Sequence, residues 1–105
     1  MIIMTTGKKL ATMMSLVGIS LQSVVKTDEP EALLPPIEAF LNYENFDIRG
    51  KLNLAKMSSE LASDCAMLAL MMSFIEDQDS KVFAMVGSLF DQAANLIMDD
   101  LGIPA

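Results

Sequence analysis

Residues 54–75 read LAKMSSELASDCAMLALMMSFI, and this stretch is too apolar for the surface helix of a small monomer. One apolar row recurs every seven positions, which is the spacing of a helical seam: Leu54, Leu61, Leu68 and Ile75. From Cys65 to Ile75 only Ser73 is polar, so the other faces of this segment are apolar as well. A helix that is apolar on every face must be buried on every face. We therefore expect a helix that other protein surrounds.

The residues after this stretch predict a long helical hairpin. We expect a main helix from about Leu52 to Glu76 and a last helix from Lys81 to Leu101, joined by a short turn. A connection this short makes the two helices antiparallel neighbours. Small residues on facing sides would let the two axes approach closely: Gly87, Ala93 and Ala94 opposite Ala62, Ala66 and Ala69. The Phe and Met side chains then turn outward to a second hairpin, and two hairpins complete a four-helix bundle.

The first half of the chain predicts an amphipathic helix and a connector. In residues 1–26, Thr5 and Thr6 offer an N-cap, and apolar positions then step by four and three: Leu10, Met14, Val17, Leu21 and Val24. In residues 27–51, Pro35 and Pro36 end one short piece, Glu31 to Leu34, and open another over Ile37 to Tyr43. Phe46 to Gly50 alternates as a short strand or an extended connector does. The predicted fold is all-α, one domain whose hairpin spans residues 52–105.

The composition predicts a homodimer. Hydrophobic residues are 52% of the 105 residues before glycine is counted, against roughly 45–50% with glycine in an ordinary soluble domain. A symmetric dimer buries such a surplus twice. We expect these residues in the dimer or partner interface: Leu61, Leu68, Met71, Met72, Ile75, Phe83, Phe90 and Ile97. A second candidate partner surface lies on the N-terminal helix: Met13, Met14, Val17 and Leu21.

The charge balance excludes several partners. The chain has 14 acidic and 7 basic residues and a net charge of −7. Nucleic-acid binding needs clustered Lys and Arg, and here only Lys8 and Lys9 lie side by side, so we expect no direct nucleic-acid contact and no membrane surface. Lys8 and Lys9 before the apolar run of Leu10 to Leu21 resemble a secretory signal, but no small-x-small cleavage site follows. The single Cys makes no intrachain disulfide, so a cytoplasmic location is expected.

Catalytic equipment is sparse in the sequence. Without His, the familiar catalytic triads and zinc sites are excluded. Cys65 has apolar helical neighbours, which raise a thiol pKa, so we interpret it as a core residue. Glu76, Asp77 and Asp79 lack the calcium-loop pattern and are expected to form a turn that caps the next helix. We therefore expect no enzyme activity, no metal and no cofactor.

Two features leave alternatives open. Asp99 and Asp100 oppose the macrodipole at the end of a helix, which fits either a basic partner or a solvated helix end. The ten methionines either fill gaps in the core or adapt a surface to a partner. The candidates for the second role are Met13, Met14, Met67, Met71 and Met72.

The second half of the chain resembles a family of short pseudomonad helical-hairpin proteins, mostly of unknown function. These residues carry the resemblance: Phe46, Ile48, Gly50, Ala55, Ser58, Ser59, Leu61, Ala62, Ala66, Lys81, Leu89, Ala93 and Leu96. Size, acidity and helical build also resemble the quorum-sensing anti-activators, which block a LuxR-type transcription factor by binding its ligand-binding domain. That resemblance implies a role in transcription regulation.

These observations together predict a small acidic homodimeric interaction module. We expect it to bind and inhibit a regulatory protein by covering an apolar surface, with a few Met, Leu and Phe anchors and with the acid excess steering a basic target. The alternative is a phage-type inhibitor, an acidic nucleic-acid mimic whose carboxylates bind a nucleic-acid-binding complex.

Overall fold

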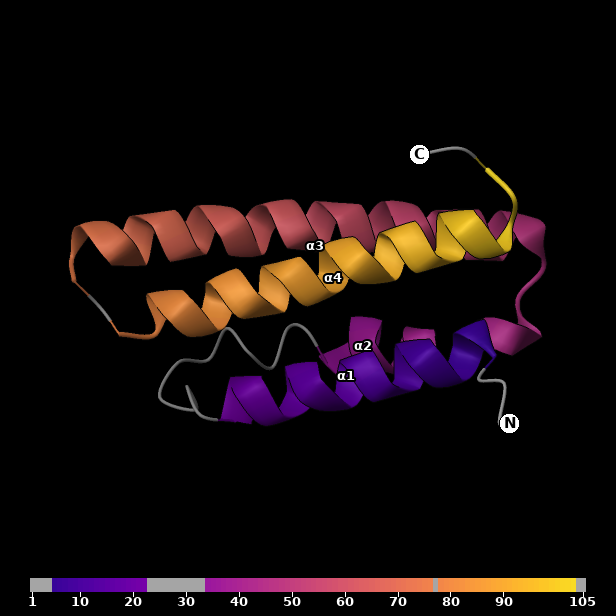
Figure 1. Cartoon of the computed structure of the whole chain (residues 1–105), viewed down its shortest axis with the longest axis horizontal. Coiled ribbons are helices and arrows are strands. Elements are labelled where there is room, and N and C mark those ends of the chain that lie inside the picture. The colour runs from indigo at the N-terminus through magenta and orange to yellow at the C-terminus, as the bar shows by residue number, and fades with distance from the viewer. Residues whose placement is uncertain (1–4, 23–33, 77, 104–105) are drawn as a thin grey trace.

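The computed structural model describes residues 5–22, 34–76 and 78–103, and every regular element among them is helical. The elements are α1 (Thr6–Gln22), α2 (Leu34–Leu41), the 3-10 turn η2 (Tyr43–Asn45), α3 (Ile48–Phe74) and α4 (Ser80–Asp100). In Figure 1, α3 forms one outer layer, α4 lies in the middle, and α1 with α2 forms the other outer layer. α4 packs against both α3 and α1. The predicted all-α fold is confirmed.

The antiparallel hairpin of α3 and α4 is also confirmed, and its axes approach closely. A Cβ atom on Gly87 would lie 3.1 Å from the Cβ atom of Cys65 and 3.2 Å from the carbonyl oxygen of Ala62. The buried Ser58 hydroxyl crosses the same seam and donates a hydrogen bond to the carbonyl oxygen of Phe90, at 2.5 Å. The two helices therefore meet through small residues in the middle of the hairpin.

Helix α3 begins at Ile48, earlier than the expected Leu52. The reason is an N-cap, because Asp47 Oδ1 accepts a hydrogen bond from the Gly50 amide at 2.8 Å. The strand alternative over Phe46 to Gly50 is therefore wrong, and only Phe46 and Asp47 are extended.

Helix α2 begins at Leu34, so Pro35 and Pro36 lie inside its first turn instead of ending one piece and opening another. Amides in the first turn have no intrahelical acceptor, so two residues without an N–H cost no helical hydrogen bond there. The predicted helix over residues 23–26 and the predicted turn over residues 31–33 lie outside the described residues.

The first turn of α1 is held by two acceptors. The Lys8 amide donates to Thr5 Oγ1 at 3.2 Å, as the N-cap prediction required. The Gly7 amide donates to Glu44 Oε1 at 2.8 Å, and a Cβ atom on Gly7 would lie 2.7 Å from Glu44 Cγ. Because this position has no side chain, η2 can approach α1 closely.

The core lies where α4 faces α1 and α2. The α4 row Phe83, Phe90 and Ile97 is buried there, with exposed fractions of 2%, 0% and 0%. The rings of Phe90 and Phe40 are 6.1 Å apart between centroids. The prediction that this row turns outward to a second hairpin is wrong, because α1 and α2 of the same chain supply the apolar cover.

Candidate protein-binding surface

The face of α3 opposite α4 is exposed along its whole length and changes chemistry midway. Its first part, here called the charged half, consists of these exposed residues: Arg49, Asn53, Lys56, Glu60, Ser63 and Asp64. Its second part, here called the apolar stripe, consists of Met67, Leu70, Met71, Phe74 and the adjoining Ile75. The stripe side chains are 62%, 60%, 60%, 80% and 73% exposed, in that order. The stripe is therefore an apolar surface on the outside of the bundle.

Helical spacing explains why the stripe lies outside. Met67, Leu70, Met71 and Phe74 follow at intervals of three, one and three, which places them on one face. The opposite face of the same turns carries the buried Cys65 and Ala69, which pack toward α4. One helix packed on one side can cover only one of these faces.

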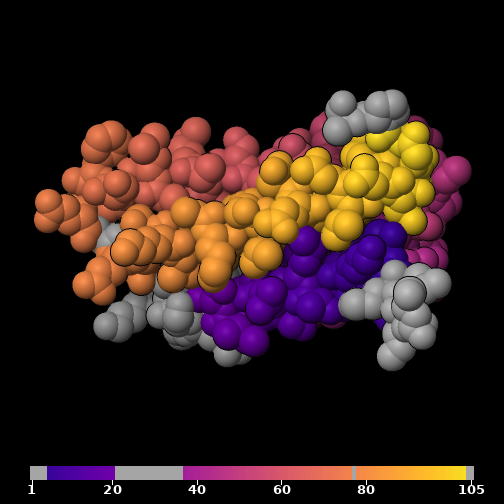
Figure 2. Space-filling model, viewed as in Figure 1, coloured from indigo at the N-terminus to yellow at the C-terminus, as the bar shows by residue number. Residues whose placement is uncertain are grey.

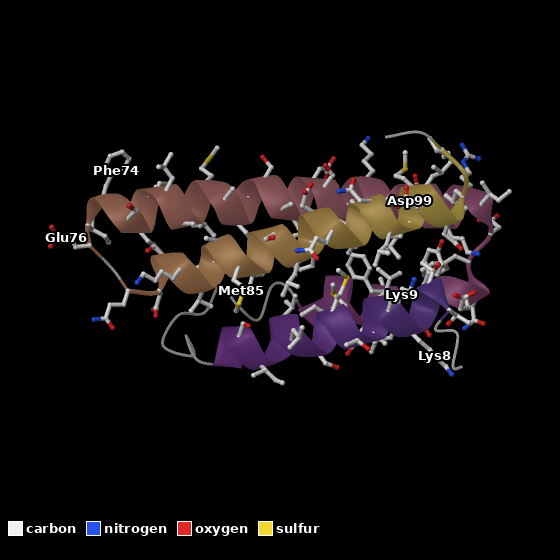
Figure 3. All side chains as sticks on the ribbon, viewed as in Figure 1. Lys8, Lys9, Phe74, Glu76, Met85 and Asp99 are labelled. Atoms are coloured by element: carbon white, nitrogen blue, oxygen red, sulfur yellow. The ribbon has the colours of Figure 1, made fainter. Side chains whose placement is uncertain are left out.

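No described segment covers the stripe. α1 and α2 lie on the far side of α4, and Figure 1 shows α3 as the outer layer. The labelled Phe74 in Figure 3 points away from α4. Figure 2 shows the tip of the hairpin extending past the described end of α1.

Acidic groups border the stripe at both ends. Asp64 precedes it on the same exposed face, and Glu76 follows it at the tip of the hairpin (Figure 3). Glu76 has a φ of +58°, so the chain turns out of the helix there. The nearest base beyond the turn is Lys81, exposed in the first turn of α4. The surroundings of the stripe are therefore predominantly negative.

The predicted interface residues divide into three groups. Met71 and Ile75 belong to the stripe. A second group is half-buried against the core: Leu61, Leu68 and Met72. Phe83, Phe90 and Ile97 are in the core, as described above, and cannot contact a partner.

The second predicted surface, on α1, is largely inside the bundle. Met14 and Val17 are buried in the hydrophobic core, and Met13 is half-buried against it. The side chain of Leu21 lies outside the described residues. Met13, Met14 and Val17 therefore form part of the chain's own packing, which corrects the prediction for this face.

Sequence reasoning named Met67 only among the methionines that adapt a surface to a partner, and it missed Leu70 and Phe74 as interface candidates. The signal was present, because the face they share carries Glu60 and Asp64 in the preceding turns. An exposed helix face is normally polar along its whole length. Where one half of such a face is apolar, that half is a candidate interaction site.

The thiol of Cys65 lies inside the core. Cys65 is 2% exposed, and burial, followed by the charge of Asp64, raises its pKa to about 11. A neutral buried thiol is a poor nucleophile at ordinary pH. The interpretation of Cys65 as a core residue is confirmed.

Asp100 has a partner within the chain. The Tyr43 hydroxyl donates to Asp100 Oδ2 at 2.5 Å, and this hydrogen bond holds the pKa of Asp100 below its usual range. Burial, with the hydrogen bond second, raises the pKa of Tyr43. The ammonium group of Lys51 lies 4.8 Å from the centre of the Tyr43 ring. An acid at the end of α4 is thus explained without an external base.

Two shallow grooves run along the seam of α3 and α4, with volumes of about 540 and 530 Å³. They share Ser59 and Asp91; small side chains such as Ala62 and Gly87 line the first groove, and longer ones such as Lys56 and Met98 line the second. Among the residues the structure describes, no three His, Cys, Asp or Glu side chains are grouped to hold a metal ion.

Comparison with known proteins finds no protein family, no curated sequence and no solved structure that matches this chain. Within the described ranges, no helix has both the length and the apolarity that crossing a bilayer requires.

Proposed function

We propose that this protein is a small interaction module that inhibits a regulatory protein by covering an apolar surface on it with the apolar stripe of α3. The observation that carries the proposal is the exposure of five large apolar side chains, 60–80% each, on one helical face. Patches of this kind on otherwise polar surfaces mark sites of protein interaction.

Burial of the stripe supplies a substantial driving force. Complete burial of one such side chain contributes roughly 1.5–3 kcal/mol, so five side chains that are about two-thirds exposed contribute roughly 5–10 kcal/mol. The partner's own apolar surface adds to this and offsets an association cost of roughly 4–15 kcal/mol. Met67 and Met71 add flexible thioether side chains that adapt to the shape of a partner.

The charges around the stripe favour a partner with a basic rim. Asp64 and Glu76 flank the apolar residues, and the whole chain carries a net charge of −7. Complementary rim charges speed association more than they raise affinity. The resemblance to quorum-sensing anti-activators such as QslA makes the ligand-binding domain of a LuxR-type transcription factor the first partner to test.

The decoy alternative, an acidic mimic of nucleic acid, has less support. Such a mimic needs carboxylates arrayed as a continuous negative surface. On the exposed face of α3, the basic Arg49 and Lys56 precede Glu60 and Asp64, so this face is not negative along its whole length. The longest uninterrupted feature of that face is apolar, which favours contact through the stripe.

A capture experiment with a charge-matched control tests the proposal. The wild-type chain, the stripe variant Leu70→Glu/Phe74→Glu and the control Asn53→Glu/Ser63→Glu are immobilised and exposed to native lysate. Both variants add two negative charges to exposed positions of the same face. The captured protein is identified by mass spectrometry, purified, and its affinity for each variant is measured by calorimetry at low and high salt.

We expect the wild type and the control to bind one regulatory protein, with the stripe variant at least about 100-fold weaker, which corresponds to about 2.7 kcal/mol. The wild-type complex should persist in high salt. Equal affinity of all three chains would refute the proposal. Equal losses in both variants, or a nucleic-acid-processing complex released by salt, would favour the decoy.

A further inference from the structure

The apolar stripe has a spacing that is the same in both directions. Met67, Leu70, Met71 and Phe74 are separated by three, one and three residues, and the reversed order gives the same intervals. Two antiparallel copies of α3 related by a twofold axis between Leu70 and Met71 would therefore align their stripes. Each central residue would then meet its own counterpart, and Phe74 would meet the second copy's Met67, a favourable contact of sulfur with an aromatic ring.

We propose that a second copy of this chain covers the stripe, in this antiparallel pairing, when the regulatory partner is absent. The proposal rests on the proposed function, because both assign the same surface. Self-association then competes with partner binding, and the protein without a partner is a dimer.

The chemistry of the outer face fixes the register of the pairing. A full-length antiparallel overlap would place each stripe against the charged half of the other copy, for example Met67 near Lys56. Overlap of the stripes alone keeps apolar side chains together and leaves both charged halves in water. The contact then covers only residues 67–75 of each helix, about 12 Å at 1.5 Å per residue.

The area of such a contact suits a dimer that can open. The roughly 5–10 kcal/mol given above for one stripe corresponds to roughly 200–400 Å² of apolar surface. Two stripes together bury roughly 400–800 Å², below the lower limit of specific, stable interfaces. A dimer of this size dissociates readily, which a competing partner requires.

Charge makes self-pairing and partner binding respond oppositely to salt. The antiparallel pairing brings Asp64 of one copy toward Glu76 of the other at both ends of the contact, and each chain carries a net charge of −7. Screening this repulsion strengthens the dimer. A partner with a basic rim is attracted instead, so salt weakens that complex while its apolar contacts persist.

Sedimentation equilibrium of the purified full chain, from micromolar to near-millimolar concentration and at low and high salt, tests the pairing. We expect a reversible dimer that is at least about threefold tighter in high salt. Leu70→Glu/Phe74→Glu should be monomeric over this concentration range, because its self-association is at least about tenfold weaker than that of the wild type. The charge-matched control Asn53→Glu/Ser63→Glu should still dimerise and so exclude a general effect of added charge.

Disulfide trapping tests the register. Under mild oxidation Met71→Cys should form a covalent dimer, because this position lies beside its own counterpart, whereas Asn53→Cys on the charged half should not. The native Cys65 is buried and does not compete. Monomeric wild-type protein at all concentrations, a dimer that persists in the stripe variant, or equal trapping at both positions would each overturn the proposal.

The two proposals fail separately. A strictly monomeric chain that still binds a regulatory protein through the stripe would overturn only the self-pairing. A dimeric chain from which no regulatory protein can be recovered, even after dilution to monomer, would overturn only the proposed function.

Discussion

The two halves of the outer face of α3 have the same backbone, the same exposure and different side chains. Lys56 and Glu60 in the charged half are what a solvated helix face normally carries. Leu70 and Phe74 in the apolar stripe occupy equivalent positions about four turns further along. The inner face is apolar in both halves because α4 covers it. The difference shows that folding determines the inner face and leaves the outer face available for recognition.

The largest expected difference in stability is between two alanine substitutions, one of a phenylalanine in the core and one of a phenylalanine in the stripe. Phe90→Ala should lower the free energy of unfolding by about 3–5 kcal/mol, because it leaves a cavity beside Phe40. Phe74→Ala should change it by less than about 0.5 kcal/mol, as an exposed substitution does. Urea unfolding of dilute protein measures both, and similar losses would mean that the stripe stabilises the fold.

Thiol chemistry compares the inner and outer faces of α3 directly. At pH 8, Cys65 should react with a thiol reagent at least about 100-fold more slowly than a cysteine placed outside by Ser63→Cys in a Cys65→Ala background. The cause is burial, which raises the pKa of Cys65 to about 11. Absorbance kinetics follow the reaction, and the rate at Cys65 should still rise as the pH approaches 11. Comparable rates at pH 8 would contradict the burial of the inner face.

Two glycines test how tightly the inner face is packed. Gly87→Ala should destabilise the fold by about 1–3 kcal/mol, because its Cβ atom would press on the backbone of Ala62. Gly18→Ala in α1 has open space and should stabilise by roughly 1 kcal/mol through helix propensity. Thermal unfolding followed by circular dichroism gives both signs, and stabilisation by Gly87→Ala would mean that the hairpin axes lie further apart.

The smallest expected effect is on the pH dependence of stability, and it comes from the hydrogen bond between Tyr43 and Asp100, near the start of α3 and far from the stripe. The pKa of Asp100 is lowered in the folded state by the hydrogen bond from Tyr43, so its stabilising contribution is present above about pH 4 and is lost as the pH falls through the folded value. Tyr43→Phe should therefore flatten the acid side of the stability curve, by less than about 1 kcal/mol because Asp100 is exposed. Urea midpoints between pH 2 and pH 6, roughly the range in which Asp titrates, measure this difference. An unchanged acid side would contradict the role of the hydrogen bond.

Much of the fold could be predicted from local patterns. The heptad row and short turn predicted the hairpin, the small residues around Gly87 predicted its close seam, and the apolar neighbours of Cys65 predicted its burial. These predictions succeeded because each depends on residues close together in sequence or on one pair of helices.

The predictions that failed depend on which element covers which row. Periodicity identified the row of Phe83, Phe90 and Ile97 but could not say that α1 and α2, and no second chain, would cover it. The start of α3 moved because the single cap at Asp47 outweighed the alternation that suggested a strand. Counting apolar residues on all faces of the helix did not identify the stripe. Comparing the two halves of a single face, one charged and one apolar, would have identified it.

The polar contacts among Gly7, Glu44, Tyr43, Asp100 and Lys51 all lie at the end of the bundle where α1 and α3 begin and α4 finishes (Figure 1). They tie the three layers together at that end, whereas the tip of the hairpin depends on side-chain packing between two helices. Amide hydrogens near the tip should therefore exchange with solvent through local opening long before those at the tied end. Residues of the stripe can consequently diverge to suit new binding targets at little cost to the folded state.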